Sequence, residues 1–352
     1  MVRSSLTLTG HCPVSGVVAV TPSPDYDLAT IGPKSYATSR RTRYGPPVRT
    51  FTNAQDQIQL FPLKSSLPML AREERADFFL NGAVCIRNVF SPKQVDSLRA
   101  VYEPLIDGGH AMVMCNPDGY SPEQLSEEFL GIAPHPAATP SGDDGKPRNM
   151  TYTRAWPDSD VLQDFLRHSV CGRLASDLYS SELEVRLLYD SIVVKEAKCD
   201  SGSSWHADFR YWPFREKEKI VTVGISLDDV PREAGPVVYL RGSHYLNENS
   251  DYLSSSERAI DRIGEYVRRF EPMSWETRAG DVVIHHPKVI HGSTPNVSDH
   301  TRRNLVIRWM CGTHHFDPAG SPGGFLKRLM NDERFPIAVG DVVRGPNFGL
   351  VY

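Results

Sequence analysis

The amino-acid sequence predicts a β-rich domain that is flanked by helices on its N-terminal side. Two observations carry this prediction. Several short segments rich in β-branched and apolar residues follow one another after residue 183, and such residues favour strands. Before residue 180, apolar residues recur instead with the spacing of amphipathic helices. At 352 residues, the chain can bury a sizeable core as one large domain or as two small ones.

The composition is that of an ordinary soluble globular protein. Apolar residues make up 40% of the sequence and charged residues 23%, both usual values. The formal net charge of −4 argues against a general nucleic-acid binder, and no apolar run is long enough to span a membrane. The first residues lack the apolar core of a signal peptide, and the six cysteines are scattered. We therefore expect a cytoplasmic monomer or homodimer that binds neither nucleic acid nor membrane.

The chain is expected to divide into an arm and one domain. Residues 1–55, rich in Ser, Thr, Pro and Gly, predict an arm that is partly disordered or wraps the surface, with a partner-binding tail as the alternative. A single domain then covers residues 56–352, with a tail over residues 313–352. Residues 107–150 have little regular pattern, and this long loop is either a lid over a binding site or a plain insertion.

The helices are expected early in the chain. Residues 69–81 have helical spacing and end at a glycine, which is a common helix C-cap. A short strand follows over residues 83–87. Ser91 is placed to cap the next helix, and Pro92 suits its first position. Residues 159–179 predict one or two further helices.

The first long strand is expected over residues 185–195. Alternation along a strand would place Tyr189 and Ser191 on one face, and Leu188 and Asp190 on the other. The charged residues 251–270 predict a helical insertion. The remaining strands are expected at residues 220–227, 237–240, around Trp275, 281–285 and 304–310.

Three side chains near the predicted strand ends indicate a metal site. His206 and Asp208 are two residues apart, so on one strand they would emerge from the same face. His291 would come from a different strand, because 83 residues separate it from Asp208. Two imidazoles and one carboxylate leave three metal positions open, which suits non-haem Fe(II) holding a bidentate co-substrate and O2. The alternative is an exposed polar pair at a strand end. His285 and His286 are expected to pack or to support the ligands.

Arg302 is the candidate partner of an acidic co-substrate. It lies eleven residues after His291. If residues 292–301 form a turn, Arg302 returns on the neighbouring strand, and its guanidinium offers a planar fork to a carboxylate. Arg303 would then point the other way. Ser293 is either a hydrogen-bond donor to the same carboxylate or a serine of the turn.

This ordered set resembles the phytanoyl-CoA dioxygenase family of Fe(II)/2-oxoglutarate-dependent oxygenases. The resemblance is carried by His206-Ala207-Asp208, by His291-Gly292-Ser293 and by Arg302. Residues 206–215 and 78–91 also resemble the family, and residues 235–236 and 241–244 do so loosely, so that the likeness covers roughly residues 70–312. It implies a double-stranded β-helix, a cupin-like jelly roll, with its core at about residues 183–312. The mouth of such a barrel lets distant strands converge on one metal.

The resemblance implies a dioxygenase that uses Fe(II), 2-oxoglutarate and O2. The two histidines and the aspartate would bind iron, 2-oxoglutarate would chelate it, and Arg302 would bind the far carboxylate. Tyr189 and Ser191 would line the keto-acid pocket. The enzyme would oxidise an unactivated C–H bond of a small molecule in secondary metabolism, by hydroxylation, desaturation or oxidative cyclisation, and would release succinate and CO2.

The substrate is not indicated by the resemblance. Gly224 stands eighteen residues after His206, where a family member would carry an aromatic residue, so the pocket wall differs. Asp208 fills the position that a halogenase would leave to chloride. Arg308 is expected to be a surface or ion-paired charge. Substrate contacts are predicted, with packing or surface roles equally open for each, at Arg154, Arg210, Tyr211, Trp212, Phe316 and Phe348. Two other functions remain open: an iron oxygenase of this fold that uses no keto acid, and a catalytically inactive binding or scaffold protein.

Overall fold

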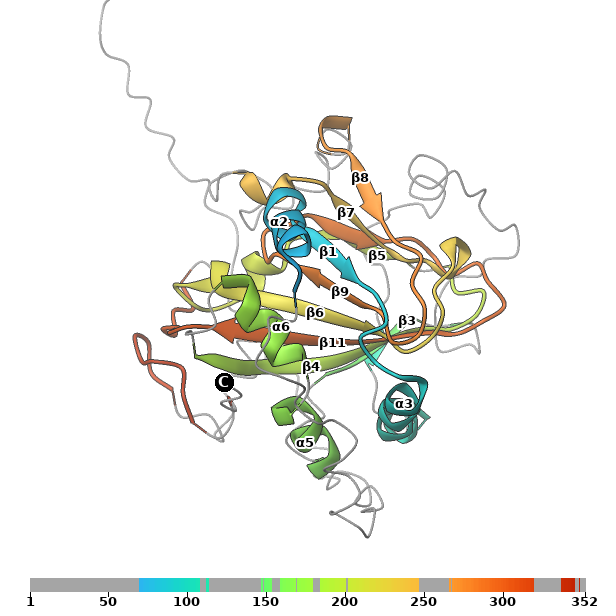
Figure 1. Cartoon of the computed structure of the whole chain (residues 1–352), viewed down its shortest axis with the longest axis horizontal. Coiled ribbons are helices and arrows are strands. Elements are labelled where there is room, and N and C mark those ends of the chain that lie inside the picture. The colour runs from blue at the N-terminus through green and yellow to red at the C-terminus, as the bar shows by residue number, and fades with distance from the viewer. Residues whose placement is uncertain are drawn as a thin grey trace, which may run out of the picture. The chain divides into compact units, whose positions relative to one another are not determined.

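The structure, a computed structural model, is built on two antiparallel β-sheets (Figure 1). In the larger sheet the strands lie in the order β1-β9-β6-β11-β4-β3-β2, and in the smaller one in the order β5-β10-β7-β8. This is the predicted β-rich jelly roll. The larger sheet contains β1 (Ala83–Ile86), β2 (Met112–Val113), β3 (Asn149–Thr153), β4 (Val185–Lys195), β6 (Ile220–Ser226), β9 (Val282–His285) and β11 (Arg302–Cys311). The smaller sheet contains β5 (Ser203–His206), β7 (Val237–Leu240), β8 (Pro272–Ser274) and β10 (His291–Ser293).

The structure describes residues 70–107, 112–113, 147, 149–153, 159–168, 170–179, 184–200, 202–246, 266, 268–319, 337–345 and 348. All of them belong to one compact unit, Val48–Tyr352. The predicted arm lies outside the described residues, and so do most of the loop over residues 107–150 and most of the insertion over residues 251–270.

The four helices among the described residues pack against one face of the larger sheet, its outer face, and α6 lies in front of β6 and β11 in Figure 1. They are α2 (Arg72–Asn81), α3 (Pro92–Asp107), α5 (Asp160–His168) and α6 (Val170–Tyr179). Their apolar side chains form one core with alternate residues of the central strands, among them Ile192, Val223, Leu305, Ile307 and Trp309. The remaining short elements are the 3-10 helices η3 (Asp208–Tyr211), η4 (Lys217–Lys219), η5 (Arg232–Ala234) and η6 (Ser243–Tyr245).

The helices predicted over residues 69–81, from residue 91 and over residues 159–179 are confirmed. Gly82 ends α2 with a left-handed φ of 87°, and its N–H donates to Phe78 O, as expected of a glycine C-cap. Helix α3 begins at Pro92 as predicted. At its start, the Gln94 side chain accepts hydrogen bonds from both the backbone N–H and the hydroxyl of Ser91, and capping by the Ser91 hydroxyl stays a prediction.

The centre of the larger sheet is a three-strand ladder in which β11 pairs with β4 and with β6. Because side chains alternate along these strands, the face opposite the helices carries polar residues of all three. The register between β4 and β11 shifts next to Arg308, where Tyr189 and Leu187 face consecutive β11 residues. This bulge places Leu188 in the inner hydrophobic cluster. The prediction that Leu188 shares the outer face with Asp190 is therefore wrong, because simple alternation fails at a bulge.

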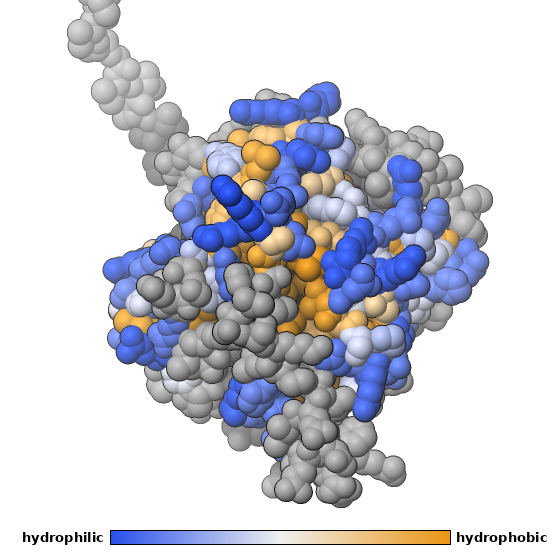
Figure 2. Space-filling view, in the orientation of Figure 1, coloured by the Kyte–Doolittle hydropathy of each residue, from blue (hydrophilic) through white to orange (hydrophobic). Residues whose placement is uncertain are grey.

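Figure 2 shows the helical side of the molecule coloured by hydropathy. Hydrophilic residues cover most of the described surface, and hydrophobic residues gather near the middle of this face, where β1, β9 and β6 lie in Figure 1. Within the described residues, no helix combines the length and the apolar character that crossing a membrane requires.

Candidate metal and co-substrate site

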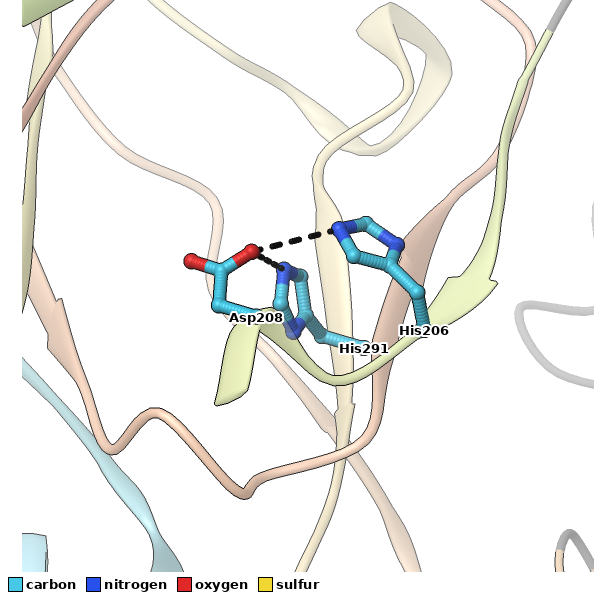
Figure 3. Close-up of side chains that lie close together, drawn as sticks. All are labelled: His206, Asp208 and His291. Atoms are coloured by element: carbon cyan, nitrogen blue, oxygen red, sulfur yellow. Dashed lines mark ion pairs between the residues drawn. The ribbon is translucent and has the colours of Figure 1, made fainter. Parts of the chain in front are cut away.

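His206, Asp208 and His291 come together at one point, as predicted (Figure 3). Their candidate ligand atoms all lie within 4.8 Å of one another. Asp208 Oδ1 is 3.5 Å from His206 Nε2 and 4.0 Å from His291 Nε2. Asp208 and His291 are buried and His206 is half-buried. Two imidazole nitrogens and a carboxylate oxygen thus converge from one side, which is the donor set that suits Fe(II) with open positions.

Strand pairing explains how residues so far apart in sequence meet. His206 at the end of β5 lies directly opposite His291 at the start of β10. Their rings are 4.3 Å apart between centroids. Asp208 does not continue β5, as the sequence predicted, but begins the 3-10 helix η3. Ala207 between them is still extended, with φ −119° and ψ 129°, so Asp208 emerges on the same side as His206.

The second carboxylate oxygen of Asp208 is held by two side chains of the larger sheet. Thr222 Oγ1 donates to Oδ2 at 2.9 Å, and His285 Nε2 lies 3.4 Å from the same atom. The other ring nitrogen of His285 lies 3.2 Å from the Tyr239 hydroxyl. These contacts leave Oδ1 for a metal and fix the plane of the carboxylate. The prediction that His285 supports the site is consistent with this arrangement.

The protonation states suit metal binding. His291 Nδ1 lies 3.0 Å from the Val289 carbonyl oxygen, which can only accept, so Nδ1 carries the hydrogen and Nε2 keeps its lone pair. Burial and the neighbouring His206 and His285 lower the pKa of His291 well below its usual value. Burial would raise the pKa of Asp208, but the facing imidazoles hold it well below its usual value. Neutral imidazoles and an ionised carboxylate are the forms that ligate metals.

Arg302 begins β11 and is almost completely buried, with 5% of its surface exposed. It does not lie on the strand next to His291, as predicted, but in the facing sheet, because the chain crosses between the sheets after β10. Its Nη1 donates to Gly235 O at 2.9 Å, and its buried Nε has no hydrogen-bond partner. Burial lowers the pKa of Arg302 to about 10, so the guanidinium stays charged at neutral pH.

Only glycine fits at position 235, for reasons of backbone conformation and space. Its φ is +69°, and a Cβ there would lie 2.5 Å from the carbonyl oxygens of Thr294 and Pro295. Only glycine lets the backbone approach this closely with that conformation. The segment around Gly235 therefore offers Arg302 a backbone carbonyl as hydrogen-bond acceptor, but no carboxylate.

Lys195 is a second buried cation that sequence reasoning missed. It lies directly opposite Arg302 in the β4–β11 pairing and is 0% exposed. Its Nζ donates to Ser293 Oγ at 2.7 Å and to the Thr294 carbonyl. Burial and the charge of Arg302 lower the pKa of Lys195 well below its usual value. Two adjacent buried cations without an acidic partner among the described residues are costly, and such a pair is suited to an anion.

Ser293 is oriented by these contacts. Its Oγ accepts hydrogen bonds from Lys195 Nζ and from the backbone N–H of Ser203, the latter at 3.1 Å. A hydroxyl oxygen has two acceptor positions, so its own hydrogen is left to point at a further acceptor. Of the two predicted roles of Ser293, this favours a hydrogen-bond donor to the co-substrate carboxylate over a serine that only forms the turn.

Asn296 holds the crossing between the two sheets. Its side-chain amide donates to the carbonyls of Lys195, Glu196 and His300, at 3.1, 3.1 and 2.7 Å. The turn after His291 is thereby fastened to the end of β4. The same side chain therefore fixes the spacing between the histidine and the two buried cations.

The predicted keto-acid residues Tyr189 and Ser191 lie further along the same strand as Lys195. Their side chains contact Arg308, whose Nη1 donates to Ser191 Oγ at 2.9 Å and whose guanidinium carbon lies 4.5 Å from the Tyr189 ring centroid. Arg308 is half-buried on the inner face. Among the described residues, no acidic side chain forms an ion pair with Arg308. The expectation that Arg308 is a surface or ion-paired charge is therefore wrong, because the alternation that turns Arg302 inward also turns Arg308 inward.

The predicted substrate residues are placed differently from one another. Arg154 lies outside the described residues, as do the side chains of Arg210 and Tyr211. Trp212, Phe316 and Phe348 are buried together in the inner hydrophobic cluster, with 1%, 6% and 2% exposed. Their burial favours the packing role, and substrate contact by any of these residues stays a prediction.

Comparison with known protein families and proteins places these residues in context. The family model for phytanoyl-CoA dioxygenase (PhyH) matches residues 78–304. A probable phytanoyl-CoA dioxygenase of Caenorhabditis elegans is 21% identical over 250 residues, which are 68% of this chain and 75% of that protein. An L-proline trans-4-hydroxylase of Streptomyces griseoviridis is 28% identical over 33% of this chain and 51% of that protein.

Two solved structures of similar fold come from nogalamycin biosynthesis. The non-heme alpha ketoglutarate dependent carbocyclase SnoK from nogalamycin biosynthesis matches with a TM-score of 0.63 at 24% identity, over 81% of this chain and 97% of that one. The epimerase SnoN in complex with Fe3+, alpha ketoglutarate and nogalamycin RO matches with a TM-score of 0.63 at 21% identity, over 80% and 98%. At these identities, the likeness is one of fold.

Proposed function

The chain belongs to the phytanoyl-CoA dioxygenase family of Fe(II)/2-oxoglutarate-dependent oxygenases, and on that premise we propose that it oxidises an unactivated C–H bond of a small biosynthetic molecule. His206, Asp208 and His291 would hold the iron. Bound iron, with 2-oxoglutarate and O2, supplies the oxidising chemistry, and succinate and CO2 leave. The reaction would be a hydroxylation, a desaturation or an oxidative cyclisation. A carbocyclase and an epimerase of nogalamycin biosynthesis with this fold support a substrate in secondary metabolism.

The buried pair of Arg302 and Lys195 is the observation that carries the use of a keto acid. A dicarboxylic keto acid has one carboxylate for the metal and a second for a cation. Arg302 would bind the second carboxylate through its fork, and the hydroxyl hydrogen of Ser293 would complete the contact. Lys195 would keep that hydroxyl turned toward the carboxylate. An oxygenase of this fold that used no keto acid would leave both cations without an anion.

The chain's own residues prepare the site before any ligand arrives. Thr222 and His285 hold the carboxylate of Asp208, and the Val289 carbonyl fixes the tautomer of His291. Pre-set ligands reduce the reorganisation that binding would otherwise require. Asp208 would occupy the metal position that a halide would need, which favours oxygenation over halogenation.

Succinate release tests the proposal. Protein reconstituted without oxygen should bind one equivalent of Fe(II), and succinate should then form only with Fe(II), 2-oxoglutarate and O2 together. His206→Ala should remove both iron and succinate. His314→Ala is the matched control, because His314 is also a buried histidine but lies outside the site. Succinate at the parent rate from His206→Ala would contradict the assignment, and turnover without 2-oxoglutarate would favour the oxygenase that uses no keto acid.

We also propose a cellular compartment and an oligomeric state for this oxygenase. Two of the described cysteines, Cys85 and Cys311, are free thiols, which supports a reducing compartment such as the cytoplasm. We expect a monomer or a homodimer that acts on a small molecule without nucleic acid or membrane. Sedimentation and cell fractionation test these expectations.

A further inference from the structure

Arg308 lies on the same face of β11 as Arg302, six residues further along the strand. At about 3.3 Å per residue, six residues span roughly 20 Å. Its neighbour on β6 is Thr222, the residue that donates to Asp208. Arg308 also interacts electrostatically with Asp208 and His285. It therefore stands beside the metal ligands, far along the strand from the end that Arg302 and Lys195 occupy.

The guanidinium of Arg308 is fixed in place but is not neutralised. Ser191 accepts one of its five N–H groups, and the Tyr189 ring lies under it at cation–π distance. Its Nε is buried without a hydrogen-bond partner. No aspartate or glutamate among the described residues forms an ion pair with it. Arg303, which points to the opposite face, pairs with both Asp228 and Glu103.

The bulge in β4 builds the platform for this side chain. Leu188 and Tyr189 together oppose the single residue Arg308, so both turn toward the inner side. Bulges re-aim side chains and are frequent beside active sites. Tyr189 is further held by a hydrogen bond from Trp212. The ring beneath Arg308 is thus fixed by the backbone and by a hydrogen bond.

We propose that Arg308 binds an anionic group of the substrate, a carboxylate or an oxyanion of similar shape, and that Tyr189 and Ser191 position its guanidinium. The inference rests on the proposed function, because it places 2-oxoglutarate at Arg302. A partly buried cation without an ion-pair partner among the described residues is unfavourable, and an acidic substrate would supply that partner. A planar guanidinium is suited to carboxylates in particular. The substrate class is therefore an acidic small molecule, and Tyr189 and Ser191 serve the substrate instead of the keto acid.

The alternative role for Arg308 is to offset the charge of Asp208. That role needs only a positive charge at this place and gives no preference among ligands. The two roles differ in what they predict for an acid and its amide. An anchor prefers the acid, whereas a charge that only balances Asp208 does not distinguish them.

Two acid and amide pairs serve as probes, benzoate with benzamide and acetate with acetamide. The protein is loaded without oxygen with Fe(II) and saturating 2-oxoglutarate, so that Arg302 is occupied, and probe binding is measured by calorimetry. In the parent protein, at least one acid should bind about tenfold or more tightly than its amide. Arg308→Gln should remove this preference, and Arg308→Lys should keep part of it. Arg303→Gln is the matched control, because it makes the same charge change on the outer face and should keep the preference.

Three outcomes would overturn the inference: no binding by either acid, equal binding of acid and amide in the parent protein, or an unchanged preference in Arg308→Gln. Failure of 2-oxoglutarate to bind in the loading step would instead contradict the proposed function, so the two failures are distinguishable. If Arg308→Gln does not fold, Ser191→Ala replaces it, because it removes the hydrogen bond and leaves the charge. A several-fold loss of the acid preference is then expected, and an unchanged preference would count against the inference.

Discussion

The two faces of strand β11 carry opposite chemistry, although they share one backbone. On the outer face, Leu305, Ile307 and Trp309 are fully buried against the helices. On the inner face, Arg302 donates to Gly235 O and Arg308 donates to Ser191 Oγ, and neither forms an ion pair with an acidic residue among the described residues. The outer face supplies hydrophobic stabilisation, and the inner face holds charges that a bound ligand would balance. Substitutions one residue apart should therefore affect stability and ligand binding separately.

The largest expected effect is on the metal. His291→Ala removes a neutral imidazole from the three-residue set, and two remaining ligands hold Fe(II) poorly. We expect the iron content after anaerobic reconstitution and desalting to fall from equimolar to near zero, as measured by elemental analysis. The thermal unfolding temperature of the metal-free variant should change little by comparison. Equimolar iron in His291→Ala would remove this histidine from the ligand set.

The second largest effect should be on the affinity for 2-oxoglutarate. It compares Arg302 on the inner face of β11 with its neighbour Arg303 on the outer face. Deleting one partner of a buried charge pair costs on the order of 3–5 kcal/mol, so Arg302→Ala should weaken 2-oxoglutarate by roughly a hundredfold or more. Arg302→Lys keeps the charge but loses the fork, so its defect should be smaller. Arg303→Ala should leave the 2-oxoglutarate affinity unchanged, because that side chain pairs with Asp228 and Glu103. Titration of 2-oxoglutarate checks all three, and the reverse pattern would mean that Arg303 faces the site.

Lys195→Met should have effects of opposite sign on affinity and stability. Losing the residue that orients Ser293 should weaken 2-oxoglutarate by about tenfold, the scale of one hydrogen bond to a charged group. The free protein should unfold at the same or a higher temperature, because a buried charge is replaced by an apolar chain of similar length. Calorimetry and thermal unfolding check the two signs. Lower stability together with unchanged affinity would make Lys195 a structural residue only.

The pH dependence of stability gives a second readout for Lys195. Its pKa is lowered in the folded protein from an ordinary value of 10.5, so between these two values the unfolded chain binds more protons. The free energy of unfolding contributed by this residue therefore rises as pH rises through that window. Denaturant unfolding as the pH rises toward 10.5 should show a steeper rise in the free energy of unfolding for the parent protein than for Lys195→Met. Parallel curves would contradict burial of this amine.

The smallest effect should come from the outer face. Ile307→Val removes one buried methylene group and should lower the free energy of unfolding by about 0.5–1.5 kcal/mol. The affinity for 2-oxoglutarate should not change, because the side chain faces the helices. Denaturant unfolding and ligand titration of the same preparation provide the check. A loss of affinity larger than the loss of stability would show that the two faces are coupled.

Much of the fold could be predicted because the pattern of residues matches the physics of each element. The glycine after α2 and the proline that begins α3 mark their helices, and the β-branched run of β6 marks a core strand. The convergence of His206, Asp208 and His291 followed from their residue types and order. The sheet that carries Arg302 did not follow, because strand pairing depends on contacts distant in sequence.

Lys195, Thr222 and Arg308 show why the rest of the site was missed or misjudged. A lysine at the end of a strand is usually solvated, and its burial here depends on its cross-strand neighbour Arg302. Thr222 looks like any residue of a β-branched strand until Asp208 lies against it. Arg308 is an even number of residues from Arg302 on β11, so the sequence already indicated that both lie on the same face. Lys195 is likewise an even number of residues from Tyr189 and Ser191, which were both predicted to face the pocket.

The spacing between Arg302 and Arg308 also limits how this enzyme can diversify. Because the two side chains share one uninterrupted strand, loss or gain of a single residue between them would exchange the faces of all that follows. Trp309 would then turn into the site and Arg308 into the helical layer. Substrate preference can therefore change here by point substitution but not by insertion or deletion. Length variation among relatives should collect in the connections between strands, and β11 should keep a constant length.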